Sequence, residues 1–257
     1  MVRRKKYLTS FGDPTNALYT ENVKSSMSLL RVLFFVLLAN MSFGQINFFK
    51  LYSDVGDDYG EGIVQLEDSS YAITGSSSSF FGTGAQAFLL KIDSTGNYLW
   101  SNHYGGGEAD VGRRVLYKQN VGFFIAGYTN SFGNGAYDFY LIKTDEAGNQ
   151  EWEKSYGDFG WERVYDAVLT ADTGVLMVGE TNSTLNNNRD MYIVRTDING
   201  DTLWTKQLGT EYEDMLTSIH TLNDSTYYLA GSMYSADSLV TKGLSLIHIS
   251  EPTRLSR

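Results

Sequence analysis

One short stretch returns three times at a fixed distance, and it limits what this chain can fold into. It reads KIDSTGNYLW at Lys91–Trp100, KTDEAGNQEW at Lys143–Trp152 and RTDINGDTLW at Arg195–Trp204, so successive tryptophans lie 52 residues apart. The same period relates the glycines Gly75, Gly127, Gly179 and Gly231. A repeat of about 50 residues with strand-like composition is typical of the blades of a β-propeller or of a related array.

The repeated stretch has the chemistry of a β-hairpin. Each copy places a glycine three residues and a tryptophan seven residues after an aspartate: Asp93, Gly96 and Trp100; Asp145, Gly148 and Trp152; Asp197, Gly200 and Trp204. The carboxylate can accept N–H groups of the turn, and the glycine supplies a positive φ. The tryptophan then lies on the last strand, where burial between units would contribute at most about 4–6 kcal/mol. We expect all these residues to be structural.

Each repeat offers four strand-like runs, which in the first repeat are 62–66, 71–75, 87–92 and 98–104. Only 2 Pro, with 26 Gly and 18 Tyr, suit short strands joined by tight turns. The sequence therefore predicts an all-β fold. The predicted architecture is a β-propeller fragment with about three complete four-stranded blades, at 60–105, 112–157 and 164–209, and a partial fourth at 216–243. The periodic glycine is expected either to allow close approach of backbones or to mark a bulge.

The N-terminal region has the features of a secretory signal. In residues 27–44, Arg31 precedes the apolar run 32–38, and small residues stand at −3 and −1 of a cut before Gln45. The alternatives are a buried strand or a membrane anchor, although the run is too short to span a membrane as a helix. Residues 1–26 show no repeat and are expected to be a spurious or disordered extension, or else a long basic start to the signal. The predicted localisation is secreted or cell surface.

The repeat also extends beyond its complete units. Residues 46–52 align with the last strand of a repeat, with Tyr52 in the place of Tyr104, so they are expected to form a fourth strand without its natural neighbours. At the other end, Leu244–Arg254 reads LSLIHISEPTR and resembles the translation of a transposase sequencing adapter. We therefore expect 244–257 to be a non-native tail, the repeats to be interrupted near Gly243, and His248 to have no function.

The expected mature piece, 45–243, is acidic. It holds 12 Lys and Arg against 27 Asp and Glu, a formal net charge of 12 − 27 = −15. Such a surface repels nucleic acid and anionic membranes. The predicted partners are therefore a glycan or a protein at the cell surface, with no nucleic acid and no membrane insertion after signal cleavage. With no Cys, the chain has neither disulfides nor thiolate zinc sites.

At residues 46–243 the pattern of motifs resembles the secreted β-propeller repeat family called SBBP. The resemblance rests on Asp138–Asp145, on the Gly-Asn and Trp that follow, on Tyr156-Gly157, and on the Gly-Tyr-Thr-Asn-Ser at 127–131. It implies a propeller of about seven blades in an exported bacterial or archaeal protein, which in Bacteroidota often ends in a type IX sorting domain. The chain departs from the family at Asp57-Asp58, at 159–162 and at Leu208, which replaces a tyrosine.

No arrangement typical of catalysis is visible in the sequence. The turn aspartates could ligate Ca²⁺, but they lack the spacing and bidentate glutamate of an EF-hand, and turn capping is the simpler interpretation. The carboxylates Asp58, Asp110, Glu162 and Asp214 are periodic, which favours structural hydrogen bonds over ligand contact. His103 and His220 occupy unrelated places in the repeat. We predict no catalytic residues, no metal and no cofactor.

Aromatic residues in the loops after the second strand of each repeat are the candidate ligand-binding residues. They are Phe80, Phe81, Tyr128, Phe132 and Tyr234. Aromatic rings beside Asn and Ser can stack on sugars or contact peptides, and the alternative is packing at the blade rim. The predicted function is a non-catalytic binding or surface-display module. The alternatives are a carbohydrate-active or quinone-dependent enzyme with its catalytic residues in missing blades, and a passive spacer in an adhesin.

Overall fold

The computed structural model describes residues 48–52, 56–79, 84–183, 188–233 and 243–250. The chain forms two compact units, Met1–Phe49 and Lys50–Arg257, and all the described strands lie in the second. The expected N-terminal extension 1–26 and signal segment 27–44 lie outside the described residues, as do Phe80, Phe81 and Tyr234. No helix occurs among the described residues, so none there is long and apolar enough to cross a membrane.

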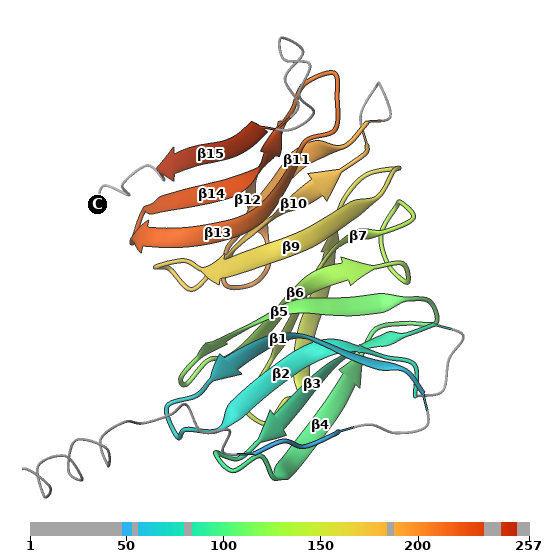
Figure 1. Ribbon diagram of the computed structural model, residues 1–257, viewed down its shortest axis with the longest axis vertical. Coiled ribbons are helices and arrows are strands. Elements are labelled where there is room, and N and C mark those ends of the chain that lie inside the picture. The colour runs from blue at the N-terminus through green and yellow to red at the C-terminus, as the bar shows by residue number, and fades with distance from the viewer. Residues whose placement is uncertain (1–47, 53–55, 80–83, 184–187, 234–242, 251–257) are drawn as a thin grey trace, which may run out of the picture. The chain divides into compact units, whose positions relative to one another are not determined.

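The second unit consists of antiparallel sheets that follow one another along the chain (Figure 1). Sheet 1 contains β1 (Asp58–Gln65), β2 (Tyr71–Ser77), β3 (Gln86–Ile92) and β4 (Tyr98–Tyr104). Sheet 2 contains β5 (Asp110–Lys118), β6 (Gly122–Thr129), β7 (Asp138–Thr144) and β8 (Gln150–Tyr156). Sheet 3 contains β9 (Glu162–Leu169), β10 (Val175–Thr181), β11 (Asp190–Thr196) and β12 (Thr202–Leu208). Sheet 4 contains β13 (Met215–Asn223), β14 (Thr226–Met233) and β15 (Gly243–Ser250). The prediction of an all-β chain with one sheet per repeat is confirmed.

The third strand of sheet 4 differs from the expectation that the repeat stops near Gly243. β15 includes most of the adapter-like string, and it pairs with β14 from Thr226↔Ser250 to Met233↔Gly243. Ile249 is buried in the core between sheets 3 and 4. The segment can join the sheet because it alternates apolar and polar residues and is rich in β-branched and long aliphatic side chains, which suit a strand beside the free edge of β14.

Consecutive sheets share apolar cores, and each core draws on both sheets of a pair. Leu89 of sheet 1 and Phe123 of sheet 2 belong to the first core. Phe124, the next residue of β6, points the other way and packs with Met177 of sheet 3. Val178 then packs with Leu229 of sheet 4. Because side chains alternate along a strand, the middle strands of sheets 2 and 3 are buried on both faces, and the sheets stabilise one another.

At the edge of the first two cores, a tryptophan packs on the turn of the next sheet. A Cβ added to Gly148 would lie 2.6 Å from the indole of Trp100, and one added to Gly200 would lie 2.7 Å from that of Trp152. Both glycines also have positive φ, +81° and +76°. Beside them, Tyr104 donates its hydroxyl to the Gly148 carbonyl and Tyr156 donates to the Gly200 carbonyl, each at 2.7 Å. Glycine is therefore required here both for its backbone conformation and for the space that the indole occupies.

Residues 48–52 do not form the strand that the sequence predicts. They nevertheless make the hydrogen bonds that the fourth strand makes in a complete repeat. Tyr52 donates to the Gly96 carbonyl at 2.5 Å, as Tyr156 does to Gly200, and Lys50 Nζ donates to Asn97 Oδ1 at 2.5 Å, as Lys154 does to Asp201. Among the described residues, this segment belongs to none of the four sheets.

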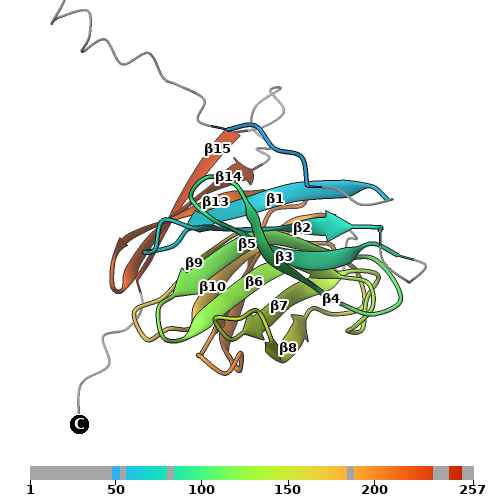
Figure 2. The same ribbon diagram turned by 90° about the horizontal axis from the view of Figure 1, so that it is seen from below.

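The first strand of every sheet carries a β-bulge at the same place in the repeat. The bulged residues, which have no partner in the pairing of the first strand with the second, are Glu61, Arg113, Tyr165 and Thr217. Opposite each bulge stands the periodic glycine, and a Cβ on Gly127 would lie 1.8 Å from the Val111 carbonyl oxygen. Both interpretations of this glycine are therefore correct, because the backbones approach closely where the strand bulges. The first strands also lie against one another, β1 on β5, β5 on β9 and β9 on β13 (Figure 2).

Candidate functional site

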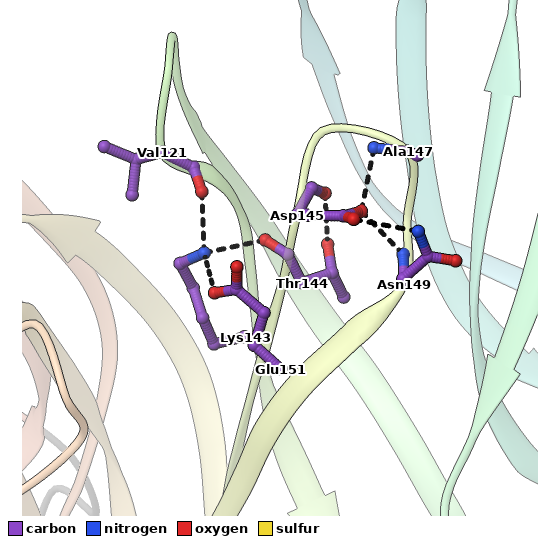
Figure 3. Close-up of polar contacts among 7 residues, drawn as sticks. All are labelled: Val121, Lys143, Thr144, Asp145, Ala147, Asn149 and Glu151. Carbon is purple, nitrogen blue, oxygen red and sulfur yellow. Dashed lines mark hydrogen bonds and ion pairs between the residues drawn. The ribbon is translucent and has the colours of Figure 1, made fainter.

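The repeated aspartates use their carboxylate oxygens within their own turns. Asp145 Oδ1 accepts from the backbone N–H groups of Ala147 at 2.9 Å and Asn149 at 2.8 Å, and Oδ2 accepts from Asn149 Nδ2 (Figure 3). Asp93 and Asp197 accept the equivalent backbone bonds. These bonds stabilise the charged carboxylate, and the side-chain and backbone bonds from Asn149 lower the pKa of Asp145. The geometry is that of turn capping.

A buried cation stands beside two of these turns, those of Asp145 and Asp197. Lys143 Nζ donates to the carbonyls of Val121 and Thr144 and to Glu151 Oε2, at 2.7, 2.8 and 2.7 Å (Figure 3). Arg195, in the same place of the next repeat, pairs with Asp172 at 2.6 Å. Each cation ties the turn between the first and second strands to its own sheet, so its donors are used inside the protein rather than offered to a ligand.

The second series of carboxylates is also hydrogen-bonded inside the protein. Asp110 accepts from the Gly106 N–H and the Ser131 hydroxyl, both at 2.7 Å, and from the Thr129 hydroxyl. Glu162 makes the equivalent bonds to the Asp158 N–H, Thr181 and Ser183. These side chains fix the connection between one sheet and the next. Across the described ranges, no three His, Cys, Asp or Glu side chains gather as a metal site would require.

Of the aromatic residues predicted to bind a ligand, two lie among the described residues, and the structure does not bring them together. Phe132 is 37% exposed and packs near Tyr140, with ring centroids 5.8 Å apart. Tyr128 lies at the end of β6, with its ring edge-to-face against Tyr137 at 5.5 Å. Tyr128 belongs to a larger cluster between sheets 2 and 3.

That cluster, here called the Arg163 cluster, consists of Tyr128, Tyr137, Trp161 and Arg163. The Arg163 guanidinium carbon lies 5.8, 5.2 and 5.0 Å from the ring centroids of Tyr128, Tyr137 and Trp161. A parallel bridge between Tyr137 and Trp161 holds two of the rings in place. All four residues are half-buried, so part of each remains accessible. Three rings within about 6 Å of one cation make a preorganised surface that is both aromatic and positive.

A second arginine lies nearby, but its charge is already paired. Arg113, on the bulge of β5, forms an ion pair with Glu61 at 2.8 Å and stands 5.7 Å from the ring centroid of Tyr165. Burial raises the pKa of the Tyr128 hydroxyl, and the charges of Arg113 and Arg163 act in the opposite direction. The two guanidinium groups therefore both act electrostatically at Tyr128.

The Arg163 cluster occupies places in the repeat that other sheets fill differently. In the preceding repeat the four equivalent residues are Ser76, Ala85, Ala109 and Val111, and in the following repeat they are Glu180, Arg189, Glu213 and Met215. In the following repeat Arg189 pairs with both glutamates, Glu180 at 3.5 Å and Glu213. The sequence analysis found Tyr128 but missed Tyr137, Trp161 and Arg163. A comparison of the repeats for positions at which the residue type changes, rather than positions at which it is kept, would have identified these three residues.

The comparisons with known proteins add no relative. No protein-family model matches the chain, and no curated protein matches its sequence. The functional interpretation therefore rests on the residues of the repeat and on the geometry of the Arg163 cluster.

Proposed function

We propose that this chain belongs to an exported β-propeller that binds a glycan or a protein at the cell surface without catalysing a reaction. A repeat of 52 residues, one antiparallel sheet per repeat and a shared core between each pair of sheets are what propeller blades require. The signal-like segment 27–44 and the acidic composition support export.

The Arg163 cluster is the observation that carries the binding role. Its rings supply broad, rigid contact area at a small cost in conformational entropy, and its guanidinium supplies hydrogen-bond donors. The same places in the neighbouring repeats are small or internally paired, so the cluster is not needed to build a sheet. Residues that a scaffold does not require are the natural candidates for recognition.

A glycan array with the secreted protein tests the binding role, and the same incubation followed for sugar release tests catalysis. We expect retention of one glycan class without turnover, and loss of that retention in Trp161→Ala. The matched control is Tyr98→Ala, which removes an aromatic residue that is 59% exposed at the start of β4 in sheet 1. Release of sugar by the wild-type protein would favour the enzyme alternative, and equal loss in both variants would contradict a role for the cluster.

A further inference from the structure

Arg163 differs from every other arginine in the described part of the chain. Four of them pair with carboxylates: Arg113 with Glu61, Arg114 with Asp166, Arg189 with Glu180 and Glu213, and Arg195 with Asp172. Within the described residues, the contacts of Arg163 are the three aromatic rings, and its Nε is buried without a hydrogen-bond partner. Its guanidinium is thus held by aromatic rings, and no carboxylate among the described residues neutralises its charge.

An unpaired guanidinium is unusual in so acidic a chain, whose formal net charge is −10. Carboxylates are abundant, yet none of those described reaches Arg163. In the following repeat the same four places supply Glu180 and Glu213, which neutralise Arg189. In the Arg163 cluster those two places hold Tyr128 and Trp161. The two places that hold carboxylates in the following repeat are therefore held by aromatic rings here, while the arginine itself has moved from the place of Tyr137 to that of Met215.

We propose that the Arg163 cluster binds an acidic sugar, with the sugar carboxylate paired to the Arg163 guanidinium and a sugar face packed on the rings. This inference names the ligand of the surface proposed above and rests on that function. A carboxylate matches the guanidinium because two parallel N–H···O bonds fit its planar fork. Sugar rings expose apolar C–H faces, which match the faces of tryptophan and tyrosine.

The surrounding charge limits the ligand further. Arg113 is held by Glu61, so among the described residues Arg163 is the one arginine without an ion pair, in a chain that is acidic as a whole. A polyanion of high charge density would be repelled by that chain, whereas a single uronate residue among neutral sugars would not be repelled to the same degree. The preferred ligand is therefore a glycan with isolated carboxylates, and its binding weakens as salt concentration rises.

Paired ligands test this inference on the wild-type protein, independently of any variant. The probes are a galactose tetramer with a single galacturonate residue, the same tetramer with that carboxylate reduced to the alcohol, and a sulfated tetragalactose, each titrated calorimetrically. We expect the carboxylated tetramer to bind at least tenfold more tightly than the reduced one. Equal binding of the first two, or preference for the sulfated one, would overturn the inference while leaving a glycan-binding role standing. Binding of none of the three would also overturn the inference, and an empty glycan array would in addition overturn the glycan-binding role.

Two arginine variants then assign the preference to a residue. Arg163→Gln should remove the tenfold preference, with binding of the reduced tetramer unchanged, and Arg163→Lys should retain only part of it, because an ammonium does not pair bidentately. The control Lys206→Gln removes another cation that lies over an aromatic ring, 5.5 Å from the Trp204 centroid. It should keep the full preference. A preference that survives Arg163→Gln would overturn the assignment.

Discussion

Arg114 and Asp166 stand at the same place in consecutive repeats, and their side chains meet, with Arg114 Nε 2.5 Å from Asp166 Oδ1. The other carboxylate oxygen, Oδ2, accepts from the backbone N–H of Ile219 at 3.0 Å, in the sheet beyond. One carboxylate therefore links sheets 2, 3 and 4. Asp166 is 3% exposed, whereas the Arg114 side chain is 46% exposed, and solvent weakens an ion pair with an exposed partner. The hydrogen bond from the Ile219 N–H therefore contributes more to stability than the ion pair with Arg114.

Replacing Asp166 should destabilise the stack of sheets. In Asp166→Ala the buried Ile219 N–H loses its acceptor and Arg114 loses its partner, so we expect a loss of about 2–4 kcal/mol in the free energy of unfolding. Asp166→Asn keeps an acceptor and should lose less. Denaturant unfolding followed by tryptophan fluorescence measures both, and equal losses in the two variants would show that the charge, rather than the hydrogen bond, is what counts.

The tyrosine-to-carbonyl bonds between sheets predict a small, repeated effect. Tyr156→Phe removes the hydroxyl that donates to Gly200 at 2.7 Å and leaves the ring in place, so it should lower the free energy of unfolding by about 0.5–1.5 kcal/mol. Tyr104→Phe should cost a similar amount, and the double variant the sum of the two, because the sites lie at different pairs of sheets. Tyr98→Phe, with a hydroxyl 3.3 Å from Ser101 on the exposed face, is the control and should change little.

Gly200 cannot accept a side chain. It has φ +76°, and a Cβ there would lie 2.7 Å from the Trp152 indole. Gly200→Ala should therefore lower the thermal midpoint, with at least about 1–2 kcal/mol arising from the left-handed backbone conformation alone. Gly107→Ala is the matched control, since no atom lies within 4 Å of a Cβ placed there. If both variants unfold at the wild-type temperature, the packing of indole on turn described above is incorrect.

The proximity of the Asp138 and Glu162 carboxylates predicts that the stability of the folded protein depends on pH. A Cβ on Gly157 would lie 2.0 Å from Asp138 Oδ1 and 2.2 Å from Glu162 Oε2, so these oxygens are at most 2.0 + 2.2 = 4.2 Å apart. Asp138 Oδ1 is buried without a hydrogen-bond partner. Burial, with a further contribution from the Glu162 charge, raises the pKa of Asp138. Above its unfolded pKa the unfolded chain loses this proton before the folded chain does, so the group costs stability as pH rises towards its folded pKa.

Asp138→Asn should remove that cost, since its amide N–H can donate to Glu162. The variant should be more stable than the wild-type protein at pH 7, and the difference should shrink as the pH falls to about 4, near the ordinary pKa of an aspartate. Asp110→Asn is the contrasting variant. It replaces a carboxylate that accepts three hydrogen bonds and should be destabilising at pH 7. Thermal unfolding across this pH range decides, and a constant difference for Asp138→Asn would contradict the pKa argument.

The sequence predicted the repeating parts of this fold because they are fixed by local chemistry. The aspartate and glycine of each turn act within five residues, and the alternation of apolar residues sets which face of a strand is buried. The strand positions in the three complete repeats follow from these signals. The sequence did not predict β15 or the absence of a strand at 48–52, because both depend on which neighbouring strand is present to pair with.

The candidate site was harder to predict, because its residues come together through tertiary structure. Tyr128 lies in β6 and Trp161 directly before β9, and only the packing of β6 against β9 brings their rings to the same guanidinium. The bulge in β5 likewise determines where Arg113 points, and no local propensity marks it.

The four changing places of the repeat have a consequence for evolution and for design. Selection can rewrite them in one repeat without touching the aspartates, glycines and tryptophans that hold adjoining sheets together. Transplanting Tyr, Tyr, Trp and Arg onto Ser76, Ala85, Ala109 and Val111 would then place a second copy of the cluster on the same frame. Under the binding role proposed above, such a chain would gain a second recognition surface by local substitution, much as an antibody varies its loops.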